Sequence, residues 1–452
     1  MTDDRRLNDD PGPAAAPHPR RTDGPAPLLI QNASLLLTME PSIGDGVLGA
    51  LSQTDVAIQN GMIRDIGTDL PCPDGAEVID ATDKIVLPGF VDIHTHLWQS
   101  AIRGGAADRS LGGWLDTCAR PTLPKIGPTD MYRFVRLSSL DTVQTGVTTV
   151  VDWVHEIGMD ATGEYIRALD DSGLRYVYAA LQGDGATGLL PTVKKEIIDR
   201  RPHASLMVAA HVSMANLDHA ERQWAMAQEL GAMLTCHTLE QDFQREGDPI
   251  RAFELIGALG PRLLLNHAIH LTDDEVSLVA ERDVRAAYCP NSNMRLGSGI
   301  MRLPELRAKG TKVGLGLDGG TNDTADFFSL MKSAVGLQRV KAQSCDVYPS
   351  ISEVLRLATL GGAEAIGMDE EIGSLKVGKR ADIILVDPAA LNFAPQFDWI
   401  GQIVLNGRPS NVDTVIVGGR LLKRHGRLLG VDESHVVREA EAAARRIRSA
   451  GR

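Results

Sequence analysis

The sequence predicts an α/β fold in which a (β/α)8 barrel carries a small β-sandwich domain built from both ends of the chain. Between residues 88 and 373, short β-branched and apolar runs alternate with helical patterns. Eight such units in about 285 residues match the size of this kind of barrel. In addition, many of the predicted strands end in an ionisable residue, and β-rich stretches lie at both ends of the chain.

The predicted barrel strands are short apolar runs bounded by glycine, proline or polar residues. The first is the run that ends at His96, and the other seven cover residues 146–152, 174–179, 206–211, 233–237, 263–267, 285–289 and 313–318. Helical patterns lie between them, for example at 220–230 and 273–281. Thr272 is a suitable N-cap for the second of these, and acidic residues fill its first turn.

A doubly wound sheet is the alternative architecture. It would carry a glycine-rich phosphate turn after its first strand, and the sequence has none. In a barrel, the carboxyl ends of the strands converge on one mouth, where catalytic groups are held. We therefore expect one cluster to form from the residues that end the strands: His96, Asp152, His211, His237, His267 and Asp318.

The two ends of the chain have a different sequence pattern from the barrel region. Short β-like runs fill residues 28–86, with a hairpin signal at Asn60-Gly61, and similar runs return at 381–386, 413–417 and 420–422. Neither stretch is long enough for a sandwich alone, so we expect them to pair. The predicted organisation is a disordered tail at 1–26, a small β-sandwich domain from 27–87 with 374–430, a catalytic barrel at 88–373 and a C-terminal helix at 431–452.

Composition excludes several classes of partner. The formal net charge of −13 argues against nucleic acid and anionic membranes, which are bound by clustered Lys and Arg. No apolar stretch reaches the roughly 20 residues of a membrane span. The five cysteines are scattered and odd in number, and no hydrophobic segment follows the Arg pairs of the tail. We expect a cytoplasmic protein that acts on a small molecule.

A metal site is the first chemical prediction. His94 and His96 stand two apart at the end of a strand, so both rings point to the same side, although this spacing also occurs on ordinary strands. Taken singly, His237 reads as a satisfied polar residue and Asp318 as a turn former. At the mouth of one barrel, the four together predict a site for one divalent ion, zinc first and iron as the alternative.

Two further residues have the positions of acid–base groups. Glu240 follows His237 by three residues, so the loop after the fifth strand can carry its carboxyl group over a metal-activated water. His267 ends the sixth strand, where it can hydrogen-bond the attacked oxygen. No lysine ends the fourth strand to bridge two metals, which favours a single ion.

Five motifs resemble the amidohydrolase superfamily, in the family's order and spacing. The resemblance runs from about residue 28 to 430 and is nearest to the cytosine deaminase-like branch, which contains adenosylhomocysteine, guanine and 8-oxoguanine deaminases and triazine chlorohydrolases. The motifs are Pro-Gly-Phe-Val-Asp-Ile-His-Thr-His at 88–96, His-Thr-Leu-Glu at 237–240, Asn-His-Ala-Ile-His-Leu at 266–271, Cys-Pro-Asn-Ser-Asn-Met-Arg-Leu-Gly-Ser-Gly at 289–299 and Gly-Leu-Asp-Gly at 316–319.

The resemblance implies roles for the residues in these motifs. It implies hydrolytic deamination of a heterocycle: metal-activated hydroxide attacks a C–NH2 carbon, Glu240 protonates the adjacent ring nitrogen, and ammonia leaves. His267 and Asp318 are implied to support the tetrahedral centre, and His211 to contact the substrate. The implied metal ligands are His94, His96, His237 and Asp318.

Substrate contacts are predicted from fewer residues. Gln99 matches a His-x-His-x-x-Gln pattern of guanine and 8-oxoguanine deaminases, where the amide reads an oxopurine edge. Trp98 either stacks on a flat ring or packs the barrel mouth, and Arg103 and Arg295 either contact oxygen groups or lie on the surface. Nucleoside-type relatives place an acid after the Trp that matches Trp114. Asp116 lies too early for that role, so a compact oxopurine, pterin or similar heterocycle is favoured.

Two other functions remain open. One is a hydrolase that expels another leaving group, such as chloride, an alkylamine or the amine of an opened cyclic amide. Glu240 counts against simple halide displacement, because ammonia needs protonation and chloride does not. The other is a non-catalytic binding protein on a decayed barrel, although no ligand of the metal site is missing. We further expect a homo-oligomer, a dimer.

Overall fold

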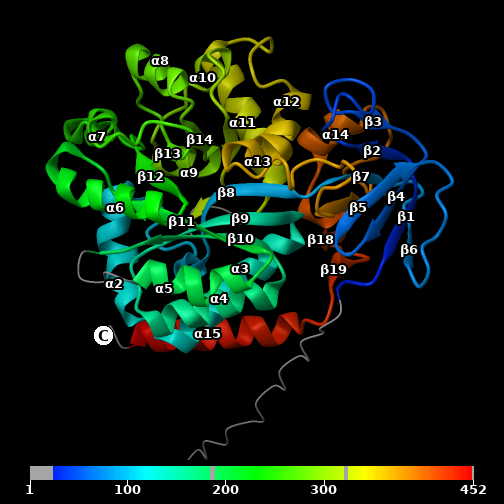
Figure 1. Ribbon diagram of the computed structural model, residues 1–452, viewed down its shortest axis with the longest axis horizontal. Coiled ribbons are helices and arrows are strands. Elements are labelled where there is room, and N and C mark those ends of the chain that lie inside the picture. The colour runs from blue at the N-terminus through cyan, green and yellow to red at the C-terminus, as the bar shows by residue number, and fades with distance from the viewer. Residues whose placement is uncertain (1–23, 184–188, 320–323, 450–452) are drawn as a thin grey trace, which may run out of the picture.

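The computed structural model describes residues 24–183, 189–319 and 324–449. The predicted disordered tail therefore lies outside the described residues, apart from its last few positions. Figure 1 shows a large α/β body beside a smaller β region, in which blue strands from the start of the chain lie against orange strands from its end. This arrangement confirms the predicted fold class.

A closed parallel sheet forms the centre of the large body. Strands β8 to β14 neighbour one another in chain order, with β15 beside β14 and β16 beside β8. Because β15 and β16 are consecutive pieces of the last strand, the nine segments occupy eight barrel positions. The segments are β8 (Phe90–His96), β9 (Val147–Val154), β10 (Arg175–Leu181), β11 (Ala204–Ala210), β12 (Met233–Thr238), β13 (Leu263–His267), β14 (Arg285–Tyr288), β15 (Val313–Leu315) and β16 (Asp318–Gly319).

Helices surround the barrel (Figure 1). The expected N-cap of α8 is present, because Thr272 and Glu275 form a reciprocal capping box at its start. The longer helices are α3 (Pro128–Gln144), α4 (Met159–Ser172), α6 (Leu217–Glu229), α8 (Asp273–Glu281) and α11 (Phe327–Ala342). The shorter ones include η1 (Leu97–Ile102), α1 (Leu111–Trp114), α5 (Leu189–Glu196), η7 (Asp242–Gly247), α7 (Pro249–Leu255), α9 (Pro290–Leu296), α10 (Leu303–Ala308), α12 (Ile351–Arg356), α13 (Gly362–Ala365) and α14 (Trp399–Asn406).

The small domain consists of two sheets, ordered β5-β4-β1-β6 and β20-β19-β18-β17-β7-β2-β3. The second sheet joins the two ends of the chain, because Leu87 of β7 pairs with Ile384 of β17. Its strands are β2 (Leu35–Leu37), β3 (Ala50–Leu51), β7 (Ile85–Pro88), β17 (Ile383–Val386), β18 (Val412–Val417), β19 (Arg420–Arg424) and β20 (Arg427–Leu428). The first sheet contains β1 (Leu28–Ala33), β4 (Thr54–Gln59), β5 (Met62–Gly67) and β6 (Glu77–Asp80).

Two local features stand out in the terminal regions. Asn60 and Gly61 connect β4 to β5 with φ angles of 56° and 75°, as a two-residue hairpin turn of this kind requires. Helix α15 (Glu433–Ser449) packs along α3, with Val436, Ala440 and Ala443 on its buried face (Figure 1). Among the helices of the described ranges, none is both long and apolar enough to span a bilayer.

Candidate active site

The carboxyl ends of the barrel strands bring together the four predicted metal ligands. His94 and His96 come from β8, His237 from β12 and Asp318 from β16, and one donor atom from each lies within 4.8 Å of the others. Glu240, His267 and Asp318 form a second group that satisfies the same distance. The two groups share Asp318, so they are parts of one site.

The donor distances fit a single ion. The Nε2 atoms of His96 and His237 are 3.1 Å apart, and Oδ1 of Asp318 lies 3.3 Å from Nε2 of His96 and 3.4 Å from Nε2 of His94. Ligands at about 2.0–2.1 Å from a tetrahedral zinc ion lie about 3.3 Å from one another. Moreover, neither ring nitrogen of the fully buried His94 has a hydrogen-bond partner in the structure. The residues therefore fit a zinc-like ion.

A second layer of contacts orients these ligands. Nδ1 of His96 lies 2.6 Å from the carbonyl oxygen of Trp153, so the ring donates there and its Nε2 lone pair faces the cluster. The Oγ of Ser292, on α9, donates to Oδ2 of Asp318. Sequence reasoning assigned no role to Ser292, although it lies within one of the motifs that carry the resemblance.

Asp92 ties the first barrel strand to the last. Its Oδ1 accepts hydrogen bonds from the backbone N–H of His94, at 3.2 Å, and of Leu317, at 3.0 Å. One buried carboxyl group thus fixes the backbone beside His94 and beside Asp318. The sequence analysis also missed this residue, whose place two positions before His94 on the same strand was the available signal.

The backbone is unusual at three positions of the site. Leu239, His267 and Asp318 have φ angles of 49°, 72° and 62°, in the left-handed region that residues with a side chain rarely adopt. Such conformations persist only where the surrounding structure holds them, and they concentrate at functional sites. Here they occur beside Glu240 and at two residues that contact the cluster directly.

The electrostatics suit metal binding and proton transfer. Burial lowers the pKa of His94, so its ring is neutral and offers a lone pair. Burial alone would raise the pKa of Asp318, but the adjacent imidazole rings of His94, His96 and His267 hold it well below the usual range. Glu240 has the opposite shift, because burial and then the charge of Asp318 raise its pKa well above the usual range. The pKa values of two neighbouring carboxyl groups are thus shifted in opposite directions.

His267 is placed between Glu240 and Asn293. The Nδ2 group of Asn293 donates to Nδ1 of His267 at 3.0 Å, which leaves the ring proton on Nε2. That Nε2 lies 3.8 Å from Oε2 of Glu240 and has no hydrogen-bond partner in the structure. His267 therefore presents an N–H group to the space above the ligands.

The predicted substrate residues have different surroundings. Gln99 and Trp98 are buried on η1, and the indole N–H of Trp98 donates to Nδ1 of His155 at 3.1 Å, which favours the packing alternative for Trp98. His211 directly follows β11 and is exposed, with its ring 6.2 Å from that of His237. Arg103 instead forms an exposed ion pair with Asp141 at 2.8 Å, which favours a surface role.

Arg295 reaches the site from α9. Its Nη1 donates to the carbonyl oxygen of Ala107 at 3.0 Å, and its guanidinium lies 6.0 Å from the ring of Trp114. Its Nε and Nη2 atoms are buried without a hydrogen-bond partner. Arg295 thus anchors the segment after the first strand and retains donors that a ligand can use.

A three-histidine, one-aspartate cluster at the mouth of a (β/α)8 barrel, with a buried carboxyl group of raised pKa beside it, defines a metal-dependent hydrolase. Residues 85–422 match the model of the Amidohydrolase family. The chain belongs to that family, and it is a hydrolase that acts on C–N bonds.

Relatives match over nearly their whole length. A 5-methylthioadenosine/S-adenosylhomocysteine deaminase of Pelotomaculum thermopropionicum is 32% identical, covering 93% of this chain and 99% of the relative. A 5'-deoxyadenosine deaminase of Methanosarcina acetivorans is 31% identical, covering 93% and 98%. The crystal structure of an adenosine deaminase from Xanthomonas campestris with bound zinc superimposes with a TM-score of 0.82 at 27% identity, covering 94% of this chain and 99% of that one.

Proposed function

We propose that this protein is a metal-dependent hydrolytic deaminase that exchanges the amino group of an adenine-type N-heterocycle for oxygen and releases ammonia. One observation carries the proposal. Glu240 is buried, its pKa is raised by that burial, and it stands beside Asp318 and His267 without belonging to the four-residue metal group. An acid in this position suits a leaving group that must be protonated. Relatives named as deaminases of adenine nucleosides support it.

Each residue of the cluster has one task in this reaction. His94, His96, His237 and Asp318 would hold the ion, zinc first and iron as the alternative. A divalent ion in this site would lower the pKa of a water molecule toward neutrality. Asp318 takes a proton from the attacking water, and Glu240 gives a proton to the ring nitrogen next to the reacting carbon. The Nε2–H group of His267 hydrogen-bonds the incoming oxygen.

The proton count closes over one turnover. Water contributes an oxygen to the carbon, and one of its protons passes through Asp318 to the amino group, which leaves as ammonia when the C–N bond breaks. The second water proton returns to Glu240 and replaces the one that Glu240 gave to the ring nitrogen. The two acids are therefore needed in different states at the start, Asp318 ionised and Glu240 protonated. The opposite directions of the two pKa shifts favour that starting state.

The group attached to the heterocycle is a separate question. Asp116, the acid nearest to the position expected of a ribose-binding residue, forms an ion pair with Arg120, and both side chains are about two-thirds exposed. This supports a compact substrate such as an oxopurine or a pterin, whereas the relatives are named for nucleosides. We keep Gln99, His211 and Arg295 as proposed substrate contacts.

The test is ammonia release by the metal-loaded protein. The panel holds adenine, guanine, pterin, 5'-deoxyadenosine, 5-methylthioadenosine and a chlorotriazine, with ion content measured on the same sample. We expect ammonia from at least one aminated purine or pterin and about one ion per chain. Ammonia from none of these compounds would overturn the proposal, and chloride release from the triazine alone would support the other leaving group.

We also propose a homodimer in the cytoplasm. All five cysteines are free thiols in the structure, which suits a reducing compartment. Light scattering of the purified protein tests the dimer, and a mass of one chain at micromolar concentration would contradict it.

A further inference from the structure

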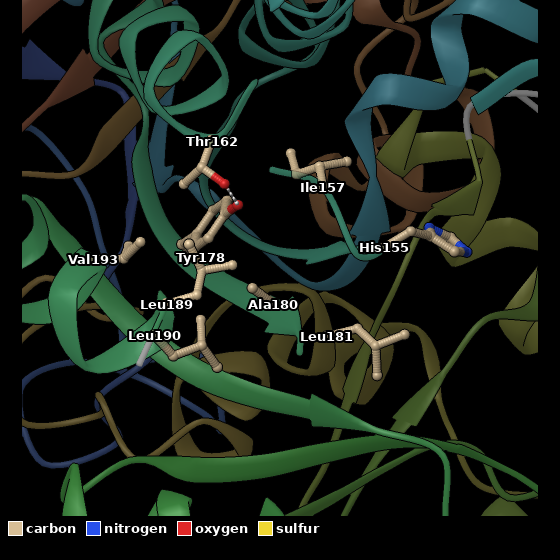
Figure 2. A pocket seen from close by; sticks show the side chains of 9 residues that line it. All are labelled: His155, Ile157, Thr162, Tyr178, Ala180, Leu181, Leu189, Leu190 and Val193. Atoms are coloured by element: carbon tan, nitrogen blue, oxygen red, sulfur yellow. Dashed lines mark hydrogen bonds between the residues drawn. The ribbon is translucent and has the colours of Figure 1, made fainter. Parts of the chain in front are cut away.

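His155 lies in the mouth of the barrel, and none of the roles above involves it. It is the first residue after β9, and the centroid of its ring lies 5.3 Å from that of His96 and 5.1 Å from that of Trp153. Figure 2 shows it at the edge of a small hollow lined by Thr162, Tyr178 and aliphatic side chains, with its ring turned away from them. The ring therefore belongs to the polar mouth rather than to the apolar lining.

The hydrogen bond from Trp98 determines which ring nitrogen of His155 carries the proton. An indole N–H is a donor only, so Nδ1 of His155, 3.1 Å away, must accept and carries no proton. The ring proton is then on Nε2. Trp98 is only 1% exposed, so the indole holds the imidazole in one orientation. Within the described ranges, Nε2 of His155 makes no hydrogen bond, and its side chain is partly exposed at the mouth.

The order of the strands places His155 opposite the acid–base groups. His155 follows the second barrel strand, β9, whereas Glu240 follows the fifth strand and His267 ends the sixth. In a closed eight-stranded barrel, the second and sixth strands face each other across the mouth. A flat heterocycle that presents one edge to Glu240 and His267 therefore presents its other edge toward His155.

We propose that the Nε2–H group of His155 is a specificity-determining donor, which binds an acceptor atom on the substrate edge that faces away from Glu240. The inference rests on the proposed function and adds the substrate feature that the site selects. In a 6-aminopurine such as adenine, the ring nitrogen N1 beside the reacting carbon receives the proton from Glu240. The acceptor on the other side is the imidazole nitrogen N7, so the site selects rings that keep this nitrogen.

The competing explanation is that His155 only packs and accepts the bond from Trp98. The two explanations differ in what a substitution does to two substrates. Loss of packing slows both equally, whereas loss of a donor slows only the substrate that has the matching acceptor. The discriminating pair is the 6-aminopurine that the panel shows to be deaminated, adenine or 5'-deoxyadenosine, and its 7-deaza analogue, in which a carbon replaces N7.

The kinetic experiment compares kcat/KM for this pair in the wild type, His155→Phe and His155→Gln. We expect the wild type to disfavour the 7-deaza compound about tenfold, the loss typical of one hydrogen bond. The kcat/KM of His155→Phe should fall about tenfold on the 6-aminopurine and stay level on its analogue, and His155→Gln, which keeps an N–H donor, should recover part of the loss. Equal losses on both compounds in His155→Phe, at unchanged ion content, would overturn the proposal.

A second measurement needs no turnover. Nitrogen-15 NMR of ring-labelled histidine should show His155 protonated at Nε2 at neutral pH, and Trp98→Phe should abolish this preference. Protonation at Nδ1 in the wild type would overturn the proposal directly. If no panel compound releases ammonia, the proposed function fails, and the NMR result still decides the assignment of His155.

Discussion

Two buried polar clusters in this molecule satisfy their polar atoms to very different degrees. Between the barrel and the small domain, the guanidinium of Arg175 on β10 donates two hydrogen bonds, of 2.8 and 3.1 Å, to the carboxylate of Asp382. The backbone N–H of Gly418 donates a third, of 2.6 Å, to the same carboxylate. At the mouth, the buried His94 nitrogens, Glu240 Oε1 and His267 Nε2 have no hydrogen-bond partner in the structure. Both clusters are nearly inaccessible to solvent.

The difference distinguishes structure from function. A buried charge stabilises a domain contact only when its partners are complete, because an unpaired buried charge carries a large desolvation penalty. The Arg175 cluster meets this condition with protein atoms alone. The cluster at the mouth does not, and its missing partners are those that an ion, a water molecule and a substrate would supply. Four experiments can test this distinction.

Glu240→Gln should have the largest effect. The amide keeps the shape of the side chain but cannot pass a proton to the substrate, so kcat should fall about 10³-fold or more. Ion content should stay at the wild-type level, because Glu240 is not one of the four ligands. Ammonia-release kinetics and metal analysis on the same preparation check both statements. Retained activity would remove Glu240 from the proton path.

Arg175→Met should destabilise the fold without changing the chemistry. Removing one partner leaves the buried carboxylate of Asp382 unpaired, which should lower the free energy of unfolding by about 3–5 kcal/mol. The double variant Arg175→Met, Asp382→Asn should recover most of this loss, because it removes both charges and keeps an acceptor for Gly418. Urea denaturation measures stability, and kcat per folded molecule should change less than twofold. A large fall in kcat would contradict the purely structural role of the Arg175 cluster.

Asp152 should make the stability of the fold depend on pH. Only its Oδ1 has a partner, the backbone N–H of Leu97 at 3.0 Å, and burial raises its pKa from 3.8 to about 6. The folded state therefore binds its proton more tightly than the unfolded state, and this stabilisation is lost as the pH rises from about 4 to about 6. Relative to Asp152→Asn, the wild type should lose about 3 kcal/mol of unfolding free energy across that window. Parallel pH profiles of urea denaturation would contradict the assignment.

Substitutions of Arg295 and Arg103 should have the smallest effects, and they test whether buried donors without partners serve the substrate. Arg295 has buried donors without partners, so Arg295→Ala should raise KM about tenfold through lost substrate contacts. Arg103 forms an exposed ion pair with Asp141, and such pairs contribute little free energy. The KM of Arg103→Ala should therefore stay within about twofold of the wild-type value. Steady-state kinetics of both variants on one substrate make the comparison. Equal effects would show that exposure does not separate them.

Periodicity and strand-end chemistry were enough to predict the barrel and to place His94, His96, His237 and Asp318 together at its mouth. Strand ends converge in this fold, so residues as distant as His94 and Asp318 could be placed together from sequence alone. His155 was missed because it lies one position beyond β9, and its role depends on the orientation of Trp98, which no local pattern records. Ser292 and Asn293 were missed for a similar reason, because their contacts depend on how α9 packs against the mouth.

The junction between the first and last barrel strands, called here the seam, determines when the metal site is assembled during folding. Thr95 of the first strand donates to the carbonyl oxygen of Asp318, 223 positions later, and Asp92 bridges to Leu317 beside it. An ion bound by His94, His96 and Asp318 would span this same seam. During synthesis, the histidines emerge long before their aspartate partner, so the complete metal site exists only after the last strand has docked on the first. Ion binding thus indicates that the barrel has closed. Removal of the ion by a chelator would destabilise the contact between the first and last strands before the rest of the barrel.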